Sequence, residues 1–306
     1  MEHVLDAGSV HHDWDRGLEP ALSIASGDVV HADLRMTAHE QLAEGASADE
    51  VAFDADRLYH LAGPIRVEGA RPGDTLRVDV LELEPGEWGW TAIRPGLGLL
   101  PDEVSELVVR TFSLRERGVV EIAPGVRIPT APFLGTMGVH PGEPAKVSAL
   151  PPNRGGGNID TRHLTVGSTL WLPIWCDGAL FSCGDPHAAQ GDGEVCLTGL
   201  ECPMRATLRF TVERRSIPAP RFATAGPLLS VSEDAGHIGT MGIDPDLMEG
   251  ARTAVRDMIG LLADEHGLTR EDAYIVCSLA GDLKILEIVD AGVWNVGFTI
   301  PRSILP

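Results

Sequence analysis

The sequence predicts an α+β protein that is mainly β, and two observations carry this prediction. Up to about residue 215, short apolar runs alternate with polar residues at the period of two that half-buried strands show. After that point apolar residues recur at helical spacing before two more strand patterns end the chain. Strands and helices therefore do not alternate as they would in an α/β fold. We expect a β-sandwich or barrel-like part over residues 1–215 and a smaller α+β portion over residues 216–306, packed on it.

Turn residues flanked by apolar runs predict two β-hairpins in the first part. Ile65 and Val67 alternate before a Gly/Pro-rich turn at residues 69–74, and a second alternating run begins at Leu76. Further along, two apolar runs over 168–175 and 179–183 are separated by a Cys-Asp-Gly turn. We expect each pair of runs to form a hairpin. Additional strand patterns cover residues 29–34, 108–114, 119–122 and 205–212.

Capping residues predict the helices of the C-terminal portion. An Asp-Pro-Asp sequence at residues 244–246 precedes apolar residues at helical spacing that continue to Gly267. Thr269, followed three residues later by Asp272, predicts the start of a second helix over residues 271–279. Strands are expected over residues 284–289 and 293–300.

Composition and charge restrict the classes of partner. The formal net charge is −21, from 24 basic and 45 acidic residues, which disfavours nucleic acid because phosphate binding needs clustered Lys and Arg. Neutral or cationic small molecules fit this charge better than anions. The five cysteines include no C-x-x-C pair, so we expect neither disulfides nor a zinc ribbon. The sequence around residues 1–14 lacks a basic and apolar leader pattern and no run of about twenty apolar residues occurs, so we expect no signal peptide and a cytoplasmic protein without a membrane partner.

Polar residues that suit metal chemistry are concentrated between residues 155 and 201. Asp185 and His187 are two apart, so an extended backbone would point both side chains to one face. Imidazole and carboxylate ligands suit zinc, whereas a set dominated by oxygen suits calcium or manganese. Taken singly, each residue is better explained by turn chemistry, and Asp192 and His163 are left as a turn residue and a structural histidine. The density of the group favours a site; its members are Asn158, Asp160, His163, Asp185, His187, Gln190, Asp192 and Glu194.

The same stretch resembles a known family. The runs GGNIDTR, GSTLWLPIW and GALFSCGDPHAAQGDGEV are similar to the signature of the acetamidase/formamidase family, and segments 63–83 and 266–290 resemble two more of its blocks. The resemblance covers most of the chain. It implies a metal-dependent hydrolase of short aliphatic amides, built mainly from β structure with a smaller α+β portion.

We therefore hypothesise that Asp160, Asp185 and His187 hold a divalent metal, with zinc expected before calcium, and that the metal activates a water molecule. Glu194 would act as base towards this water and then as acid towards the departing ammonia. Asn158 and Gln190 would hydrogen-bond the amide or orient a ligand. The expected substrate is a small neutral amide such as formamide or acetamide, and the expected assembly is a homodimer.

Three alternatives stay open at this point. Cys183 could be a nucleophile with His187 as its base, although a buried free cysteine is the commoner interpretation. A catalytically silent β-domain protein could bind calcium structurally in the same cluster. An esterase or lactamase could use the same site and differ only in the leaving group.

Two other features are interpreted as structural. The pair His11-His12 is more typical of solvent-exposed residues than of metal ligands. Trp88 and Trp90 are expected in a loop, where they would anchor it on the core or form the wall of a pocket.

Overall fold

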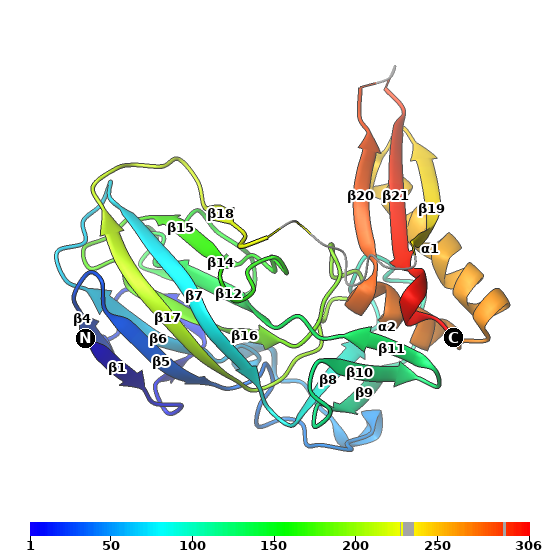
Figure 1. The fold of residues 1–306 in the computed structure, drawn as a ribbon, viewed down its shortest axis with the longest axis horizontal. Coiled ribbons are helices and arrows are strands. Elements are labelled where there is room, and N and C mark those ends of the chain that lie inside the picture. The colour runs from blue at the N-terminus through cyan, green and yellow to red at the C-terminus, as the bar shows by residue number, and fades with distance from the viewer. Residues whose placement is uncertain (227, 229–235, 290–291) are drawn as a thin grey trace.

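The computed structural model describes residues 1–306 except 227, 229–235 and 290–291. Two β-sheets pack face to face and form most of the fold (Figure 1). Across the layers, the rings of Phe181 and Phe210 meet edge to face with centroids 5.0 Å apart. The prediction of a mainly β protein with a smaller α+β portion is confirmed.

The first sheet has the strand order β1-β5-β17-β7-β15-β18. Apart from the parallel pair β1 and β5, its neighbouring strands are antiparallel. The bounds of its strands are β1 (Glu2–Leu5), β5 (Val29–Leu34), β17 (Met204–Glu213), β7 (Thr75–Pro85), β15 (Thr169–Pro173) and β18 (Arg221–Ala223).

The second sheet has the order β14-β12-β16-β6-β2, with β4 also paired to β6. Its middle strand β16 is buried along its whole length, which places the residues at its end in the interior. The bounds are β14 (Gly156–Asn158), β12 (Phe133–Val139), β16 (Phe181–His187), β6 (Leu61–Val67), β2 (Val10–His11) and β4 (Leu22–Ile24).

Both predicted hairpins are wrong. β6 and β7 belong to different sheets, and so do β15 and β16. The turns at residues 69–74 and 176–178 do reverse the chain, but each carries it across the sandwich from one sheet to the other. Local turn residues specify the reversal, whereas the pairing partner depends on residues far away in the sequence.

Among the described residues, three smaller pairs of strands accompany the two large sheets. They are β3 (Asp13–Asp15) with β13 (Lys146–Ser148), β8 (Trp88–Ile93) with β9 (Val108–Ser113), and β10 (Val119–Ala123) with β11 (Val126–Pro129). The expectation of a loop at Trp88 and Trp90 is therefore wrong, because β8 pairs with β9 over its whole length. Short 3-10 helices occur at Ala48–Glu50, Ala55–Arg57 and Arg302–Ile304.

The C-terminal portion follows its capping signals. Helix α1 (Leu247–His266) starts where the Asp246 side chain accepts from the backbone N–H of Met248 and Glu249, and it ends at Gly267 in the left-handed conformation (φ 68°). Helix α2 (Arg270–Ala280) starts where Thr269 accepts from the N–H of Asp272. The sheet beside them has the order β19-β21-β20, with bounds β19 (His237–Asp244), β21 (Trp294–Pro301) and β20 (Asp282–Glu287).

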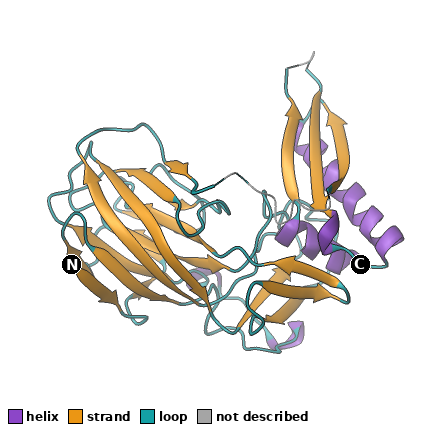
Figure 2. Ribbon diagram, viewed as in Figure 1, coloured by secondary structure: helices purple, strands orange, loops and turns teal. Residues whose placement is uncertain are grey.

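Helices α1 and α2 lie together at one end of the molecule, where α1 packs on the three-stranded sheet and α2 contacts the strand pairs β8–β9 and β10–β11 (Figure 2). One hydrophobic core cluster includes residues of the sandwich and of both helices. The division of the chain at residue 215 stays a prediction. None of the helices described here is long and apolar enough to cross a membrane.

Candidate active site

Asp185 and His187 lie at the end of β16, and both are buried. His187 Nε2 is 3.4 Å from Asp185 Oδ1, so the two-residue spacing does bring these side chains together. Thr37, which the sequence analysis did not identify, donates its hydroxyl to the same Asp185 oxygen over 2.5 Å. Asp185 is thus held by an imidazole and by a hydroxyl.

Glu201 is a second functional candidate that the sequence analysis missed. It forms isolated β-bridges with His187 and Trp90, and its Oε1 lies 2.9 Å from His187 Nε2. Glu201 is only 3% exposed to solvent. The sequence offered one signal, which is the acid between the apolar residues Leu200 and Cys202. A glutamate is rarely buried unless it has a partner, so an acid in an apolar run suggests a partner in the interior.

Gln190 fixes the orientation of the imidazole. Its Nε2 donates to the backbone carbonyl of Asp160 at 3.0 Å, so its Oε1 faces His187 Nδ1 at 2.8 Å. Nδ1 therefore carries a proton and donates a hydrogen bond to Gln190 Oε1, which leaves Nε2 facing the carboxylates. This arrangement is the one in which metal-binding histidines are commonly held.

Asp160 reaches the same place from the turn that follows β14. Gly135 on β12 leaves room for it: a Cβ at this position would lie 2.5 Å from Asp160 Oδ1 and 2.7 Å from Asp185 Oδ2. The absent side chain therefore allows the two carboxylates to converge. Their ligand atoms and that of His187 lie within 4.8 Å of one another.

Three of the acids have a left-handed backbone, which is uncommon for residues other than glycine. The φ angles are 41° at Asp160, 53° at Asp185 and 43° at Glu194. Each such residue costs of the order of 1–3 kcal/mol, and strain of this kind concentrates at functional sites. The backbone conformation thus supports the assignment of these three acids to one site.

Glu194 is less buried than Asp185 and Glu201. Its side chain is 18% exposed and lines a cavity, and its Oε1 lies 4.0 Å from His187 Nε2. With Glu201 it forms a second group of possible ligands around His187.

Burial and mutual repulsion disturb the titration of the whole cluster. Burial and the charge of Asp185 raise the pKa of Asp160 well above its usual range, and burial and Asp160 do the same to the pKa of Glu194. Burial raises the pKa of Glu201 to about 7, against the opposing charge of His187. Burial lowers the pKa of His187, but Glu201 and Asp185 outweigh this effect and raise it. Burial opposes ionisation of Asp185, yet His187 and Thr37 lower its pKa overall.

These residues fit a divalent cation. Asp160 Oδ1, His187 Nε2 and Glu201 Oε2 are buried and form no hydrogen bond, because the 2.9 Å approach of Glu201 Oε1 to His187 Nε2 lacks hydrogen-bond geometry. Buried acids that converge on one imidazole repel one another unless a positive charge lies between them. One nitrogen and several carboxylate oxygens are donors that zinc accepts, whereas the imidazole does not fit a calcium site made only of oxygen.

Tyr59 also lines the cavity and was not identified from sequence. Its hydroxyl accepts a hydrogen bond from Asn158 Nδ2 at 3.3 Å. Asn158 also accepts from the Thr136 hydroxyl and donates to the carbonyl of Leu150, so its polar atoms are largely occupied within the protein. Burial and the charge of Asp185 raise the pKa of Tyr59, so its hydroxyl keeps its proton.

The C-terminal portion holds the loop that carries Glu194. The Gly191 N–H donates to the carbonyl of Ser278 at 2.7 Å, and Ser278 Oγ accepts from the Cys196 N–H and donates to the Thr198 carbonyl. A Cβ at Gly191 would lie 1.8 Å from the Gly281 carbonyl oxygen, so the two backbones touch. Helix α2 and the residue after it are therefore part of the support of the site.

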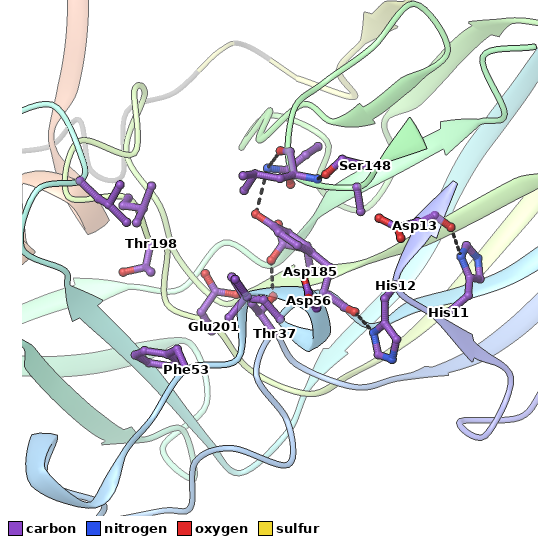
Figure 3. A pocket seen from close by; sticks show the side chains of 18 of the residues that line it. His11, His12, Asp13, Thr37, Phe53, Asp56, Ser148, Asp185, Thr198 and Glu201 are labelled. Atoms are coloured by element: carbon purple, nitrogen blue, oxygen red, sulfur yellow. Dashed lines mark hydrogen bonds between the residues drawn. The ribbon is translucent and has the colours of Figure 1, made fainter. Parts of the chain in front are cut away.

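The cavity beside the cluster has a volume of about 930 Å³. Figure 3 shows Phe53 and Thr198 on one side of Asp185 and Glu201, and His11, His12 and Asp13 on the other. The interpretation of His11-His12 as solvent-exposed residues is wrong, because both line this cavity and His11 is 9% exposed.

A cluster of imidazoles lies next to the cavity. The rings of His12 and His39 contact that of His60 with centroid distances of 5.2 and 6.2 Å, and Glu40 Oε2 is 4.0 Å from His60 Nε2. His60 is 3% exposed, and neither of its ring nitrogens has a hydrogen-bond partner. Burial and the neighbouring His12 lower the pKa of His60 to about 4.

Cys183 is poorly suited to be a nucleophile. It is fully buried in β16, and burial raises the pKa of its thiol to about 12. None of the five cysteines, all of which are described, lines the cavity or forms a disulfide. His163 and Asp192 pair with each other at 3.4 Å and are not part of either group of possible ligands.

The geometry defines a β-rich protein with a buried acid and imidazole cluster that opens into a cavity. The sequence model of the Acetamidase/Formamidase family matches residues 2–149 and 143–306, and the chain belongs to this family.

Sequence relatives carry the same family names. A formamidase of Methylophilus methylotrophus is 26% identical over 250 residues, which cover 63% of this chain and 61% of that protein. An acetamidase of Mycolicibacterium smegmatis is 28% identical over 251 residues, which cover 62% of each. The matches thus span about three fifths of the length of these relatives.

Solved structures share the fold over nearly the whole chain. An acetamidase from Bacillus halodurans is 30% identical with a TM-score of 0.70, and 98% of each chain is covered. A predicted acetamidase/formamidase from Thermoanaerobacter tengcongensis is 28% identical with a TM-score of 0.71, covering 99% of this chain and 97% of that one. A γ-lactamase from Delftia acidovorans has a TM-score of 0.90 at 21% identity, covering 98% and 90%, and this likeness concerns the fold alone.

Proposed function

We propose that this chain hydrolyses carboxamides to a carboxylate and ammonia. Family membership and the names of the relatives support this activity. The observation that carries the proposal is the set of unpartnered buried atoms on Asp160, His187 and Glu201, beside a cavity that can admit a substrate.

Asp160, Asp185, His187 and Glu201 would hold a divalent cation, which we expect to be zinc rather than calcium. Such an ion, when bound, polarises the amide carbonyl and lowers the pKa of water. Gln190 orients His187 through the Nδ1 hydrogen bond and does not need to touch the substrate. Thr37 orients Asp185 through the hydrogen bond from its hydroxyl to Oδ1.

Glu194 acts as the general base because it lies at the cavity wall beside the cluster, where a bound cation would offset the burial and the Asp160 charge that raise its pKa. It takes a proton from the attacking water as the water oxygen bonds to the carbonyl carbon. The same proton then passes to the amide nitrogen, the C–N bond breaks, and ammonia leaves. Tyr59 donates its O–H to the carbonyl oxygen as negative charge develops there, and Asn158 positions that phenol.

The test combines metal analysis with ammonia release from formamide and acetamide before and after chelation. We expect about one zinc per chain and activity that chelation removes. Glu194→Gln should keep the metal and lose about 10²- to 10⁴-fold in rate, because only proton transfer is removed. His187→Ala should lose both, and the control Asp192→Asn should keep both. Activity that survives complete metal removal and disappears on thiol alkylation would instead assign the reaction to Cys183.

The homodimer and the cytoplasmic location stay predictions. Met241 and Ile243 alternate along β19 and are 59% and 66% exposed, which is consistent with a protein contact on that face of the sheet. Light scattering of the wild type and of Met241→Asp would test the assembly; a monomeric wild type would contradict the prediction.

A further inference from the structure

The cavity is much larger than the amides after which the family is named. Acetamide has about as many non-hydrogen atoms as four waters, which fill roughly 120 Å³ in the liquid. The cavity measures about 930 Å³, within the range that holds drug-sized ligands. A substrate of acetamide size would leave most of this space to water.

The side of the cavity that carries Phe53 is built from apolar side chains. Phe53 stacks on Trp90 with ring centroids 5.4 Å apart and an angle of 26° between the planes. The Arg94 guanidinium lies 5.2 Å from the centroid of the Phe53 ring. Trp90 is itself fixed by a 3.2 Å hydrogen bond from its Nε1 to the Thr37 carbonyl. This wall is therefore held in place before any ligand arrives.

Two exposed leucines add apolar surface to the cavity. Leu97 and Leu150 are 42% and 56% exposed, and both line the cavity. Large apolar side chains that are exposed inside a cavity gain free energy when a ligand covers them. A short acyl group cannot cover them, whereas a longer one can.

The charges around the cavity disfavour an anionic ligand. Arg94 forms no ion pair among the described residues, and Lys146 is paired with Asp13. Asp15 and Asp56 also line the cavity, so acidic groups outnumber basic ones there. An anionic acyl group would meet these carboxylates and the acids of the cluster.

We infer that the substrate is a neutral carboxamide with an extended apolar acyl group, of medium-chain alkanoyl or phenylalkanoyl size. The inference rests on the proposed amide hydrolysis. The amide group lies at the Asp185 and Glu201 cluster, and the acyl group lies along Phe53 and Leu97. The opposite side of the cavity, with His12 and Asp13, is polar and suits the departing ammonia.

A homologous series of primary amides tests the inference. We expect kcat/KM for ammonia release to rise about threefold to fourfold for each methylene from acetamide to hexanamide, and to be high for 3-phenylpropanamide. Leu97→Ala should flatten this rise, because it removes apolar surface from a loop residue without touching the core. Val166→Ala, which is 50% exposed and outside the cavity lining, is the control and should keep the wild-type slope.

The outcomes separate the inference from the proposed function. Turnover of acetamide with a flat or falling series would overturn the inference and leave amide hydrolysis standing. Absence of ammonia from every amide, acetamide included, would refute the function itself. Faster hydrolysis of the monoamide of hexanedioic acid than of hexanamide would overturn the neutral class and assign an anionic substrate to Arg94.

Discussion

Acidification should destabilise the protein through His60. Its pKa in the folded state is about 4 because burial and His12 disfavour the charged imidazolium, and the ordinary value is 6.5. Between these values the unfolded chain binds more protons than the folded one, so stability rises with pH and is lost as pH falls from 6.5 to 4. The difference in pKa corresponds to about 3 kcal/mol. The groups that face this ring are His12, His39 and Glu40.

Urea unfolding at pH 7, 5.5 and 4 can measure this contribution against a matched variant. His60→Leu removes the titrating group, so the wild type should lose about 3 kcal/mol more than His60→Leu between pH 7 and pH 4. His31→Leu is the control, because the His31 side chain is 42% exposed and its ring is in contact with water. Equal pH dependence in the wild type and His60→Leu would refute the reasoning.

Further variants probe the site. Gly135→Ala places a methyl group against Asp160 and Asp185, so it should lower the free energy of unfolding by about 1–3 kcal/mol and reduce the zinc content. Gly260→Ala is the control, because open space surrounds Gly260 in α1. It should leave stability unchanged or raise it in the same urea unfolding and metal assays. Glu201→Gln should weaken zinc binding at least about 10- to 100-fold in a chelator competition, and unchanged affinity would exclude Glu201 as a ligand. Tyr59→Phe should lower kcat about 100-fold at unchanged zinc content, and a loss below threefold would contradict its role at the carbonyl oxygen.

Elements with local determinants were predictable from the sequence. Asp246 and Thr269 cap the two helices as expected, because a cap needs only its own side chain and the backbone of the next turn. The strand at Val29–Leu34 was also placed correctly from its alternation. The hairpins failed because the pairing of β6, β7, β15 and β16 is decided between residues about 40 to more than 100 positions apart, which single-sequence periodicity does not report.

The sequence likewise predicted the part of the candidate site that lies within one stretch of the chain and missed most of the rest. Asp160, Asp185, His187 and Gln190 lie within one stretch of the chain, and the structure brings them together. Thr37, Tyr59 and Glu201 were missed because the first two arrive from the N-terminal third of the chain and the third was hidden in an apolar run. Asn158 was expected to hydrogen-bond the amide or orient a ligand, and its role stays a prediction; its own hydrogen bonds go to Tyr59, Thr136 and Leu150.

The contact between Gly191 and Gly281 limits how this protein can be divided or recombined. Helix α2 supplies backbone and hydroxyl partners to the loop of Glu194, so residues 1–215 alone would leave that loop without its hydrogen bonds. The C-terminal portion is then no interchangeable module: a chimera that takes it from a relative must also take the matching loop. Inheritance of the loop that carries Glu194 and of α2 should therefore be linked, although the two are about 80 residues apart in the sequence.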